Sequence, residues 1–439
     1  MIALIQAGGA GTRLKSITGD TLLKPMVPIA GKPILEHQVL SLARSGVTDI
    51  WMVCPGHTNQ IEEYFGDGSK WCVSIHYFKE SVPLGTGGAL YFAAKCIKED
   101  FFLLFGDLML DIDFKRFMKF HKKHDAIITT FAHPNSHPYD SDVLVASEND
   151  KVVHILSKKE PRDFYYENLT NAGVYVVSRE LLRTFEGLDE PVKMDFEKEL
   201  LSPSIYAGVV FAYRSSEYVK DCGTPDRYES VGRDVVNGIV ESRNLRHKQR
   251  AIFLDRDGVI NKFGNFVRTA DEFVLKEDAP VALKRINESP FLAVCITNQP
   301  VIARGETTLE ELTSIHCKMQ VLLGEKGSYL NGLYFCPHHP DKGFEGEVPE
   351  LKFDCDCRKP KIGLLLKAKE DFNIDLEKSW FVGDTRQDVQ TGINAHCRTI
   401  LITSGDPNPD GKYPDAQPDF ICRDLMEAVD IIFKEEGVN

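Results

Sequence analysis

Short apolar runs alternate with helical patterns along most of the chain, and this alternation limits the architectures that it can adopt. Strand-like runs lie at residues 2–7, 49–55, 100–107, 126–133 and 171–178, and helical patterns include residues 34–45 and 111–124. Strands that alternate with helices favour a largely parallel sheet covered by helices on both faces. The sequence therefore predicts an α/β fold.

A second series of strand signals begins after the basic segment SRNLRHKQR, and it includes AIFLDRDG, FLAVCITNQ, SWFVGDT and RTILITS. A chain of 439 residues is also too long for one ordinary hydrophobic core. We therefore expect two domains, at residues 1–240 and 250–439, joined by a connector at 241–249. Each is expected to have a mostly parallel sheet with helices on both faces.

Composition narrows the class of protein. The net charge of −13 argues against nucleic acid as the main partner. No apolar run is long enough for a transmembrane helix, and the first strand begins without the segments of a signal peptide. Eleven cysteines in such a chain indicate free thiols and a metal site rather than disulfides. We expect a cytoplasmic protein that acts on small molecules, without nucleic-acid or membrane partners, and composition predicts no oligomeric state.

Two aspartates, Asp255 and Asp257, end the first apolar run of the second domain. In open α/β sheets, ligands bind at the carboxyl ends of the strands. Two carboxylates one residue apart can take different tasks there, because one can attack phosphorus while the other exchanges a proton with the leaving oxygen. A D-x-D-G sequence by itself is equally typical of an acidic turn.

Three later motifs favour the catalytic interpretation. Thr297 ends a strand and can hold a phosphate, and Lys359 supplies a cation that offsets phosphoryl charge. Asp384 and Asp388 follow another strand and are hard oxygen ligands suited to Mg²⁺. For Asp388, a negative charge at a helix N-terminus is the alternative.

In combination these motifs resemble the haloacid-dehalogenase (HAD) superfamily of phosphatases over residues 250–439. The resemblance implies that Asp255 is the nucleophile, which forms an aspartyl-phosphate, and that Asp257 is the general acid and base. It also implies that Thr297 and Lys359 stabilise the phosphoryl group.

The same resemblance places Mg²⁺ between Asp255, the carbonyl of Asp257 and Asp384, with Asp388 as a ligand or a support. About forty residues separate Asp257 from Thr297, too few for an inserted cap domain. The second domain is therefore expected to have a capless HAD fold.

A loop rich in cysteine and histidine, CPHHPDKGFEGEVPELKFDCDCRKP, takes the place of a cap. Cys336, His338, Cys355 and Cys357 form C-x-H followed by C-x-C, a four-ligand set of the kind that structural zinc prefers. His339 is a competing ligand. The sequence therefore predicts a zinc loop.

Such a loop directly before Arg-Lys-Pro resembles the D-glycero-D-manno-heptose 1,7-bisphosphate 7-phosphatases, in which zinc folds the loop that presents substrate-recognition residues. The resemblance implies that Arg358 and Asn298 bind substrate. Pro300 and Val301 stand where the family has Ser-Gly, so this loop lacks a hydroxyl and a flexible glycine that the family has. Histidinol-phosphate phosphatases share this architecture and are the alternative.

The chain opens on MIALIQAGGAGTRL, a strand that runs into Gly8, Gly9 and Gly11. The loop matches neither the dinucleotide fingerprint nor a P-loop. Glycines let a backbone approach a ligand closely. Arg13 and Lys24 can neutralise a triphosphate and stabilise a leaving pyrophosphate.

This opening resembles the sugar-phosphate nucleotidyltransferases, and the resemblance continues to about residue 235. It implies a Rossmann-like nucleotidyltransferase fold, a base-binding loop ESVPLGTGGAL that contains Gly85, and Mg²⁺ ligands at Asp107 and Asp221. The sugar contacts that it implies are Asn171, Gly173 and Glu160.

Glu80 precedes Gly85 by five residues, about where family members read the Watson–Crick edge of the base. A carboxylate accepts from two donors, and guanine offers N1–H and N2–H₂ side by side. We therefore predict GTP as the nucleotide, with a solvated loop residue as the alternative for Glu80.

The two chemistries are consecutive. Removing the C7 phosphate of the heptose bisphosphate yields a heptose 1-phosphate, which a nucleotidyltransferase activates. The two resemblances together imply GDP-heptose synthesis for bacterial surface glycans, with Mg²⁺ in both domains and Zn²⁺ in the second. The alternatives are a mannose 1-phosphate guanylyltransferase fused to another phosphatase, and an active phosphatase fused to a non-catalytic sugar-nucleotide sensor.

Overall fold

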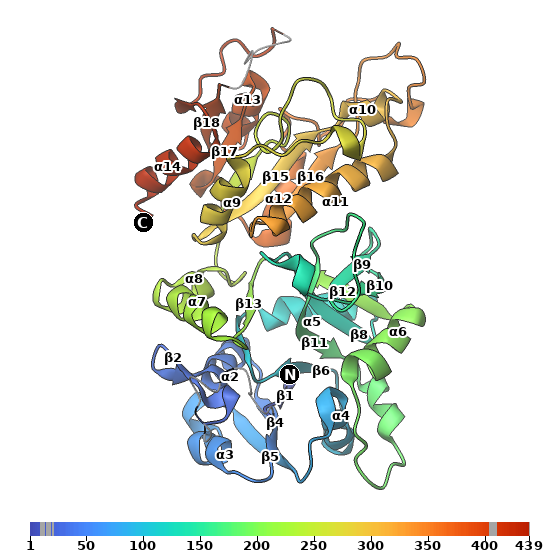
Figure 1. The fold of residues 1–439 in the computed structure, drawn as a ribbon, viewed down its shortest axis with the longest axis vertical. Helices are drawn as coiled ribbons and strands as arrows, with labels where there is room; N and C mark the ends of the chain where they lie inside the picture. The colour runs from blue at the N-terminus through green and yellow to red at the C-terminus, as the bar shows by residue number, and fades with distance from the viewer. Residues whose placement is uncertain (9–13, 15–18, 20–21, 404–410, 439) are drawn as a thin grey trace. The chain divides into compact units, whose positions relative to one another are not determined.

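The computed structural model describes residues 1–8, 14, 19, 22–403 and 411–438, and the chain divides into two compact units (Figure 1). The N-terminal unit comprises Met1–His133, Asp142–Ser157 and Thr170–Asn244. The C-terminal unit comprises Pro134–Ser141, Lys158–Leu169 and Leu245–Asn439. Two short segments inside the first sequence domain therefore group with the second unit.

A nine-stranded mixed sheet forms the centre of the N-terminal unit. Its strands are β1 (Ile2–Gln6), β4 (Asp49–Pro55), β5 (Ser74–Glu80), β6 (Phe101–Phe105), β8 (Ile128–His133), β9 (Val143–Ala146), β10 (Val152–Leu156), β11 (Thr170–Val177) and β12 (Val210–Arg214). The order is β10-β9-β11-β6-β1-β4-β5, and β8 pairs with β11 and β12. The strands from β6 to β5 are parallel, whereas β11 is antiparallel to its neighbours.

Helices cover both faces of this sheet. Their bounds are α2 (Ile34–Arg44), α3 (Gln60–Phe65), α4 (Gly85–Cys96), α5 (Phe114–His124), α6 (Ser202–Tyr206), α7 (Pro225–Val236) and α8 (Ile239–Ser242). The helices α2, α3 and α5 share one core with alternate residues of β1, β4 and β6. On the other face, Phe92 of α4 stacks on Phe78 of β5. The helix predicted from residue 111 begins at Phe114, because the Asp113 side chain caps it.

The N-terminal unit also contains two sheets of two strands each. In one, β7 (Leu108–Asp111) pairs with β13 (Tyr218–Asp221), and in the other β2 (Pro28–Ile29) pairs with β3 (Lys32–Pro33). The antiparallel register places Asp221 opposite Leu108. This pairing brings together two segments that are more than a hundred residues apart in the sequence.

The C-terminal unit contains a six-stranded sheet in which every pairing is parallel. Its strands, in spatial order, are β16 (Gly332–Cys336), β15 (Phe291–Asn298), β14 (Arg250–Leu254), β17 (Trp380–Gly383), β18 (Arg398–Ile402) and β19 (Phe420–Cys422). β15, the next strand in the sequence after β14, lies on one side of β14, and β17 lies on the other. The carboxyl end of β14 is therefore a topological switch point, where doubly wound sheets bind ligands.

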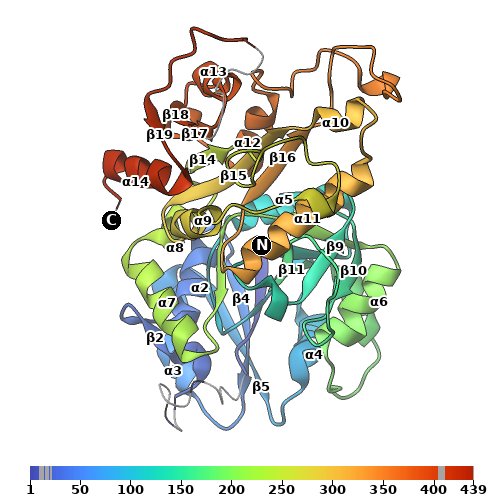
Figure 2. The ribbon, with the colours of Figure 1, turned by 45° about the horizontal axis from the view of Figure 1, so that its top comes forward.

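Helices again cover both faces of this sheet, and Figure 2 shows α13 and α14 beside β17 and β18. One core joins alternate strand residues to α9 (Ala279–Asn287), α11 (Leu309–Glu325) and α14 (Leu425–Glu436). The helix α12 (Gly363–Phe372) packs on the other face, and α10 (Pro300–Ala303) and α13 (Arg386–Asn394) complete the set. The predicted α/β class with flanking helices is confirmed in both units.

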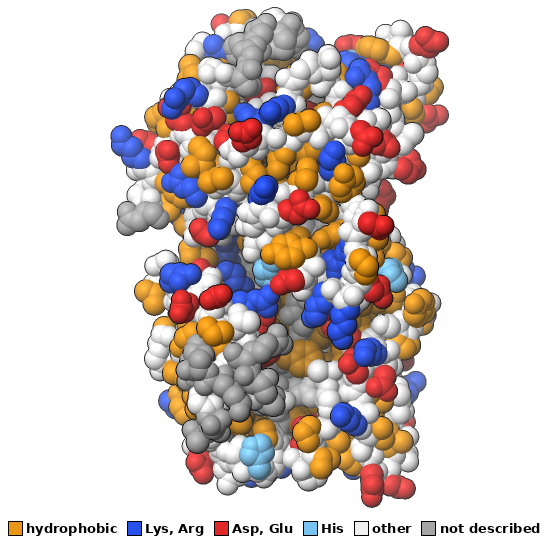
Figure 3. Space-filling view, viewed as in Figure 1, with side chains coloured by type: hydrophobic (Ala, Val, Ile, Leu, Met, Phe, Trp, Pro, Cys, Tyr) orange, Lys and Arg blue, Asp and Glu red, His pale blue; other side chains and the backbone are white. Residues whose placement is uncertain are grey.

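Acidic and basic side chains are interspersed on the face that Figure 3 shows. Among the described residues, every helix is too short or too polar to cross a bilayer. All eleven cysteines are free thiols.

Candidate functional site

The catalytic candidates of the C-terminal unit gather at the carboxyl ends of its central strands. Asp255 directly follows β14, and Lys359 precedes α12. The Lys359 ammonium lies 2.9 Å from an Asp255 carboxylate oxygen and 2.5 Å from an oxygen of Asp388. Lys359 is 2% exposed and Asp388 1%. One buried cation therefore bridges two carboxylates.

Burial and charge act in opposite directions on this group. Burial raises the pKa of Asp255 to about 7, although the Lys359 charge opposes the rise. Burial also disfavours the Lys359 ammonium, but the carboxylates of Asp255 and Asp388 prevail and raise the pKa of Lys359. A metal cation bound to Asp255, in addition to the Lys359 ammonium, would favour the ionised, nucleophilic form of Asp255.

Asp255, Asp384 and Asp388 form one of two groups, among the described residues, that can hold a metal ion, with donor atoms within 4.8 Å of one another. A Cβ at position 258 would overlap the Asp384 carboxylate, so Gly258 makes room for Asp384. Its φ of +80° also lies in the region that favours glycine. Three carboxylates suit a hard cation such as Mg²⁺. Asp388 also forms a capping box with Thr385 at the start of α13, so its helix-capping role and its contact with Lys359 coexist.

Several donors hold the Asp257 carboxylate. Both of its oxygens accept N–H groups from Arg256, and Asn261 and Gln299 donate to it at 3.0 and 2.9 Å. Burial favours the neutral acid, but the Arg256 charge and these hydrogen bonds prevail and lower the pKa of Asp257. Thr297, at the end of β15, is 1% exposed. Sequence reasoning missed Arg256 and Gln299, although both lie inside its motifs DRDG and TNQ.

The Asn298 side chain, predicted to bind substrate, brackets the backbone of Lys359. Its Oδ1 accepts the Lys359 N–H at 3.0 Å, and its Nδ2 donates to the Lys359 carbonyl at 3.2 Å. In this structure Asn298 therefore positions the residue that carries the ammonium.

The second group that can hold a metal ion comprises Cys336, His338, Cys355 and Cys357. The three Sγ atoms lie 3.2 to 3.5 Å apart, and His338 Nδ1 lies 3.2 Å from Cys357 Sγ. Sulfur ligands around a tetrahedral zinc are about 3.8 Å apart, as Zn–S bonds of ~2.3 Å require. The number and chemistry of these donors fit zinc, and their Sγ atoms are closer together than the sulfur ligands of a bound zinc ion.

His339 stays outside this group. Its Nε2 lies 3.1 Å from Arg304 Nη2, and its Nδ1 lies 3.4 Å from the Asp341 carbonyl oxygen. Arg358 donates to the carbonyl of His338 at 3.1 Å. Burial lowers the pKa of Arg358, and the Arg304 charge contributes. Among the described residues, the buried Nε of Arg304 has no hydrogen-bond partner. Sequence reasoning missed Arg304, although it lies in the same loop as Pro300 and Val301.

Lys24, Asp107 and Asp221 come from three separate motifs and converge in the N-terminal unit. Lys24 Nζ lies 2.5 Å from Asp107 and 3.9 Å from Asp221. The pairing of β7 with β13 brings the two carboxylates together, since each lies at the end of a paired strand. Arg227 of α7 hydrogen-bonds Asp221. Sequence reasoning missed Arg227, although it lies in the segment KDCGTPDRY that contains Asp221.

Glu80 and Gly8 are neighbours in the same unit. A Cβ on Gly8 would lie 3.2 Å from a Glu80 carboxylate oxygen. Glu80 is 8% exposed, and among the described residues its buried Oε1 has no hydrogen-bond partner. Burial raises the pKa of Glu80, although the Leu84 N–H opposes this. Gly85 opens α4 and its carbonyl accepts the Gln6 side chain. The predicted nucleotide contacts Gly9, Gly11 and Arg13 lie outside the described residues.

Two of the three predicted sugar contacts, Asn171 and Gly173, lie on the same strand, β11. Asn171 on β11 accepts a hydrogen bond from Thr130 at 2.8 Å and donates to the Tyr175 hydroxyl at 2.8 Å. Gly173 follows on the same strand. Glu160 is exposed in the segment 158–169, which groups with the C-terminal unit.

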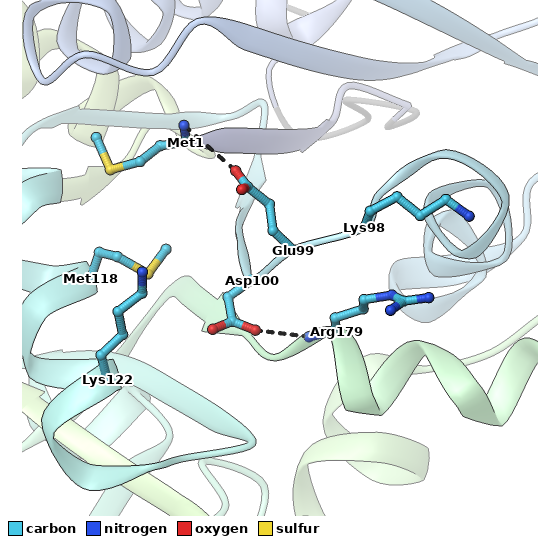
Figure 4. A pocket seen from close by; sticks show the side chains of 7 residues that line it. All are labelled: Met1, Lys98, Glu99, Asp100, Met118, Lys122 and Arg179. Carbon is cyan, nitrogen blue, oxygen red and sulfur yellow. Dashed lines mark hydrogen bonds and ion pairs between the residues drawn. The ribbon is translucent and has the colours of Figure 1, made fainter.

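A pocket of about 280 Å³ also opens in the N-terminal unit (Figure 4). It is lined by Met1, Lys98, Glu99, Asp100, Met118, Lys122 and Arg179. It lies where β1 and β6 begin, whereas Gly8 follows the carboxyl end of β1. The pocket is therefore separate from the predicted nucleotide contacts.

Two family models match the chain. The nucleotidyl transferase family matches residues 2–238, and the HAD-hydrolase-like family matches residues 356–428. The first match covers more than half of the chain.

The C-terminal part is similar to curated D-glycero-beta-D-manno-heptose-1,7-bisphosphate 7-phosphatases. The Yersinia pestis protein is 41% identical over 158 residues, which cover 36% of this chain and 82% of the relative. The Escherichia coli K12 protein is 35% identical over 189 residues, which cover 42% of this chain and 95% of the relative. Among solved structures, HddC from Yersinia pseudotuberculosis is 27% identical, with a TM-score of 0.46 and coverage of 53% of this chain and 99% of that one.

Proposed function

Because this chain belongs to the nucleotidyl transferase family and also carries a HAD phosphatase domain, we propose that it is a bifunctional enzyme. The enzyme would catalyse two consecutive reactions. The first reaction removes the C7 phosphate of D-glycero-D-manno-heptose 1,7-bisphosphate. The second transfers GMP from GTP to the heptose 1-phosphate, which gives GDP-heptose. Residues 1–240 carry the transfer, 250–439 the hydrolysis, and 241–249 join them.

This proposal is carried by three consecutive residues, 357–359, each of which has a different contact in the phosphatase domain. Cys357 belongs to the four-donor metal group, Arg358 is fixed to the same loop, and Lys359 contacts Asp255. Zinc on this loop would hold the recognition residue and the catalytic cation at a set spacing.

In the hydrolysis, an Asp255 carboxylate oxygen attacks the phosphorus and the bond from phosphorus to the sugar oxygen breaks. Asp257 gives that oxygen a proton. Water then attacks the phosphorus, Asp257 takes its proton, and the bond to Asp255 breaks to release inorganic phosphate. Lys359 and the Thr297 hydroxyl neutralise and orient the phosphoryl oxygens.

Two guanidinium groups support a bisphosphate as the substrate. Burial lowers the pKa of Arg358 and the charge of Arg304 contributes, while the buried Arg304 Nε has no hydrogen-bond partner among the described residues. Arginine forks bind phosphate strongly. We assign the second phosphate of the substrate to this pair.

In the transfer, an oxygen of the sugar 1-phosphate attacks the α-phosphorus of GTP in line, and pyrophosphate leaves. Lys24 and Arg13 neutralise the triphosphate. Mg²⁺, when bound by Asp107 and Asp221 here and by Asp255, Asp384 and the Asp257 carbonyl in the other domain, supplies positive charge to the phosphoryl oxygens.

The choice of guanine rests on Glu80. Its buried Oε1 has no hydrogen-bond partner among the described residues, and a side chain at position 8 would approach its other oxygen to 3.2 Å. Two adjacent donors, as on the guanine edge, satisfy both oxygens of a carboxylate. The base would therefore supply a donor to Oε1, the oxygen of Glu80 that has no partner among the described residues.

The test is one incubation of each anomer of the heptose bisphosphate with Mg²⁺ and equal amounts of the four nucleoside triphosphates. Mass spectrometry reads the products. GDP-heptose as the main product supports both reactions and the base. Heptose 1-phosphate without a sugar nucleotide contradicts the transferase assignment, and the absence of phosphate release from both anomers contradicts the heptose substrate.

A further inference from the structure

One side chain connects the two groups that handle the phosphoryl group and the proton in the phosphatase domain. Gln299 Nε2 donates to the Asp257 carboxylate and to the Thr297 hydroxyl oxygen, both at 2.9 Å. The Gln299 side chain is buried, since the residue is 1% exposed. Its backbone N–H donates to the carbonyl of Cys336 at 2.8 Å, so the residue is also tied to the metal loop.

The direction of these hydrogen bonds is fixed by a neighbouring arginine. Arg256 is fully buried, and its Nη2 donates to Gln299 Oε1 at 3.0 Å. An arginine can only donate, so the amide oxygen of Gln299 must face it and the NH₂ group must face Asp257 and Thr297. The ring of His316 lies 3.3 Å from Arg256 Nη1 and must accept there for the same reason.

This order of donors and acceptors decides what the Thr297 hydroxyl can do. A hydroxyl has one hydrogen to donate, and here its oxygen already accepts from Gln299. The hydrogen of Thr297 is therefore kept for an acceptor elsewhere, and a phosphoryl oxygen is such an acceptor.

We propose that Gln299 is a positioning residue that sets the Thr297 hydroxyl as a donor to the phosphoryl group and holds the Asp257 carboxylate, with Arg256 and His316 fixing its orientation. This inference rests on the roles of Thr297 and Asp257 in the proposed function. A side chain of the same shape without an NH₂ group leaves the Thr297 hydroxyl free to turn toward Asp257.

The test is a double-mutant cycle of Thr297→Val and Gln299→Met in the full-length protein. The readout is the inhibition constant of inorganic phosphate against hydrolysis of the heptose bisphosphate, with heptose 1-phosphate measured by chromatography. Each single variant is expected to raise that constant about 10-fold or more, the value of a hydrogen bond to a charged group. The double variant is expected to match Thr297→Val, because Gln299 acts on phosphate through Thr297.

Asn261→Leu is the matched control. Asn261 is fully buried and also donates to Asp257, but it forms no hydrogen bond with Thr297 among the described residues. Its loss is therefore expected to leave the phosphate inhibition constant unchanged, whatever its effect on kcat. Gln299→Leu, which also removes the NH₂ group without adding a charge, replaces Gln299→Met if the latter does not fold, as thermal unfolding reports.

Three outcomes overturn the inference, and they separate it from the proposed function. Additive effects in the cycle, or a Gln299 variant with unchanged phosphate inhibition while Thr297→Val is impaired, overturn the inference alone. Unchanged inhibition in Thr297→Val overturns the role of Thr297 in the proposed function and the inference with it.

Discussion

Lys359 Nζ lies 2.9 Å from the carboxylate of Asp255, the residue assigned to phosphoryl transfer. Because the same ammonium contacts Asp388, its removal leaves two carboxylates without their counter-charge. We expect Lys359→Met to lower the phosphatase kcat by about 100-fold or more. We also expect a loss of about 3–5 kcal/mol in the free energy of unfolding of the C-terminal unit.

Phosphate release and thermal unfolding measure the two effects. Lys361→Met, which removes a half-exposed ammonium paired with Asp354, is the control and should change neither. A Lys359→Met protein that keeps both activity and stability contradicts this assignment.

The four-donor group predicts one zinc ion per chain and a local effect of its loss. We expect Cys357→Ser to reduce zinc content and to lower phosphatase activity at least about 10-fold, because the loop no longer fixes Arg358 and Lys359. Transfer from GTP to heptose 1-phosphate should be unchanged. Elemental analysis and separate assays of the two reactions check this, with Cys317→Ser, outside the group, as the control. A zinc-free variant with full phosphatase activity would show that the loop needs no metal.

Base selection should depend on the carboxylate of Glu80. Glu80→Gln replaces one acceptor with a donor, and we expect the preference for GTP over UTP in kcat/KM to fall about 10- to 100-fold. Competition between the two nucleotides in one reaction measures the ratio directly. Glu62→Gln, at a half-exposed position of α3, is the control. An unchanged GTP preference in Glu80→Gln would show that another group reads the base.

Arg227 and Lys24 occupy the oxygens to which a metal ion would bind at Asp221 and Asp107. A metal ion must displace them, so Arg227→Gln is expected to tighten Mn²⁺ binding in the absence of nucleotide by several-fold, about 1 kcal/mol. Electron paramagnetic resonance of free Mn²⁺ measures this, in an Asp384→Asn background that weakens the phosphatase site. Arg233→Gln, an exposed position of α7, is the control. Weaker binding in Arg227→Gln contradicts the competition.

His121 makes the N-terminal unit sensitive to acid. It is 2% exposed, and burial lowers the pKa of His121 from 6.5 to about 4, although the Asp100 charge opposes this. Above pH 6.5 this histidine is neutral in both the folded and the unfolded state. As the pH falls from 6.5 toward 4, only the unfolded state takes up the proton, so the free energy of unfolding decreases. The shift is worth about 3 kcal/mol. We expect His121→Gln to remove that part of the pH dependence, and urea unfolding between pH 4 and 7 measures it. Equal pH slopes in both proteins contradict it.

The sequence predicted those parts of the fold and the site that depend on local order. Strands that end in an aspartate or a threonine placed Asp255 and Thr297 at one edge of a sheet, since parallel strands align their carboxyl ends. The spacing of C-x-H and C-x-C predicted the group that contains Cys336 and Cys357, because each pair shares one loop.

Partners brought together by long-range packing could not be predicted in this way. The contact of Arg256 with Gln299 spans 43 residues of sequence, and that of Asn171 with Thr130 spans 41. The antiparallel pairing of β11 with β6 has no local signal, because β11 is an apolar run like the parallel strands β1, β4 and β6. The grouping of the segment that contains Glu160 with the C-terminal unit could not be predicted from local sequence either.

The central claim is that one chain carries out both reactions in order, and phosphorus NMR of a single reaction tests it most directly. The mixture contains the heptose 1,7-bisphosphate, GTP and Mg²⁺, with the wild-type protein, Asp255→Asn, Lys24→Ala, or the two variants together. The account predicts GDP-heptose from the wild type, none from Asp255→Asn alone, heptose 1-phosphate from Lys24→Ala, and GDP-heptose again from the mixture. GDP-heptose formed from the bisphosphate by Asp255→Asn alone, or no sugar nucleotide from the wild type, would contradict it.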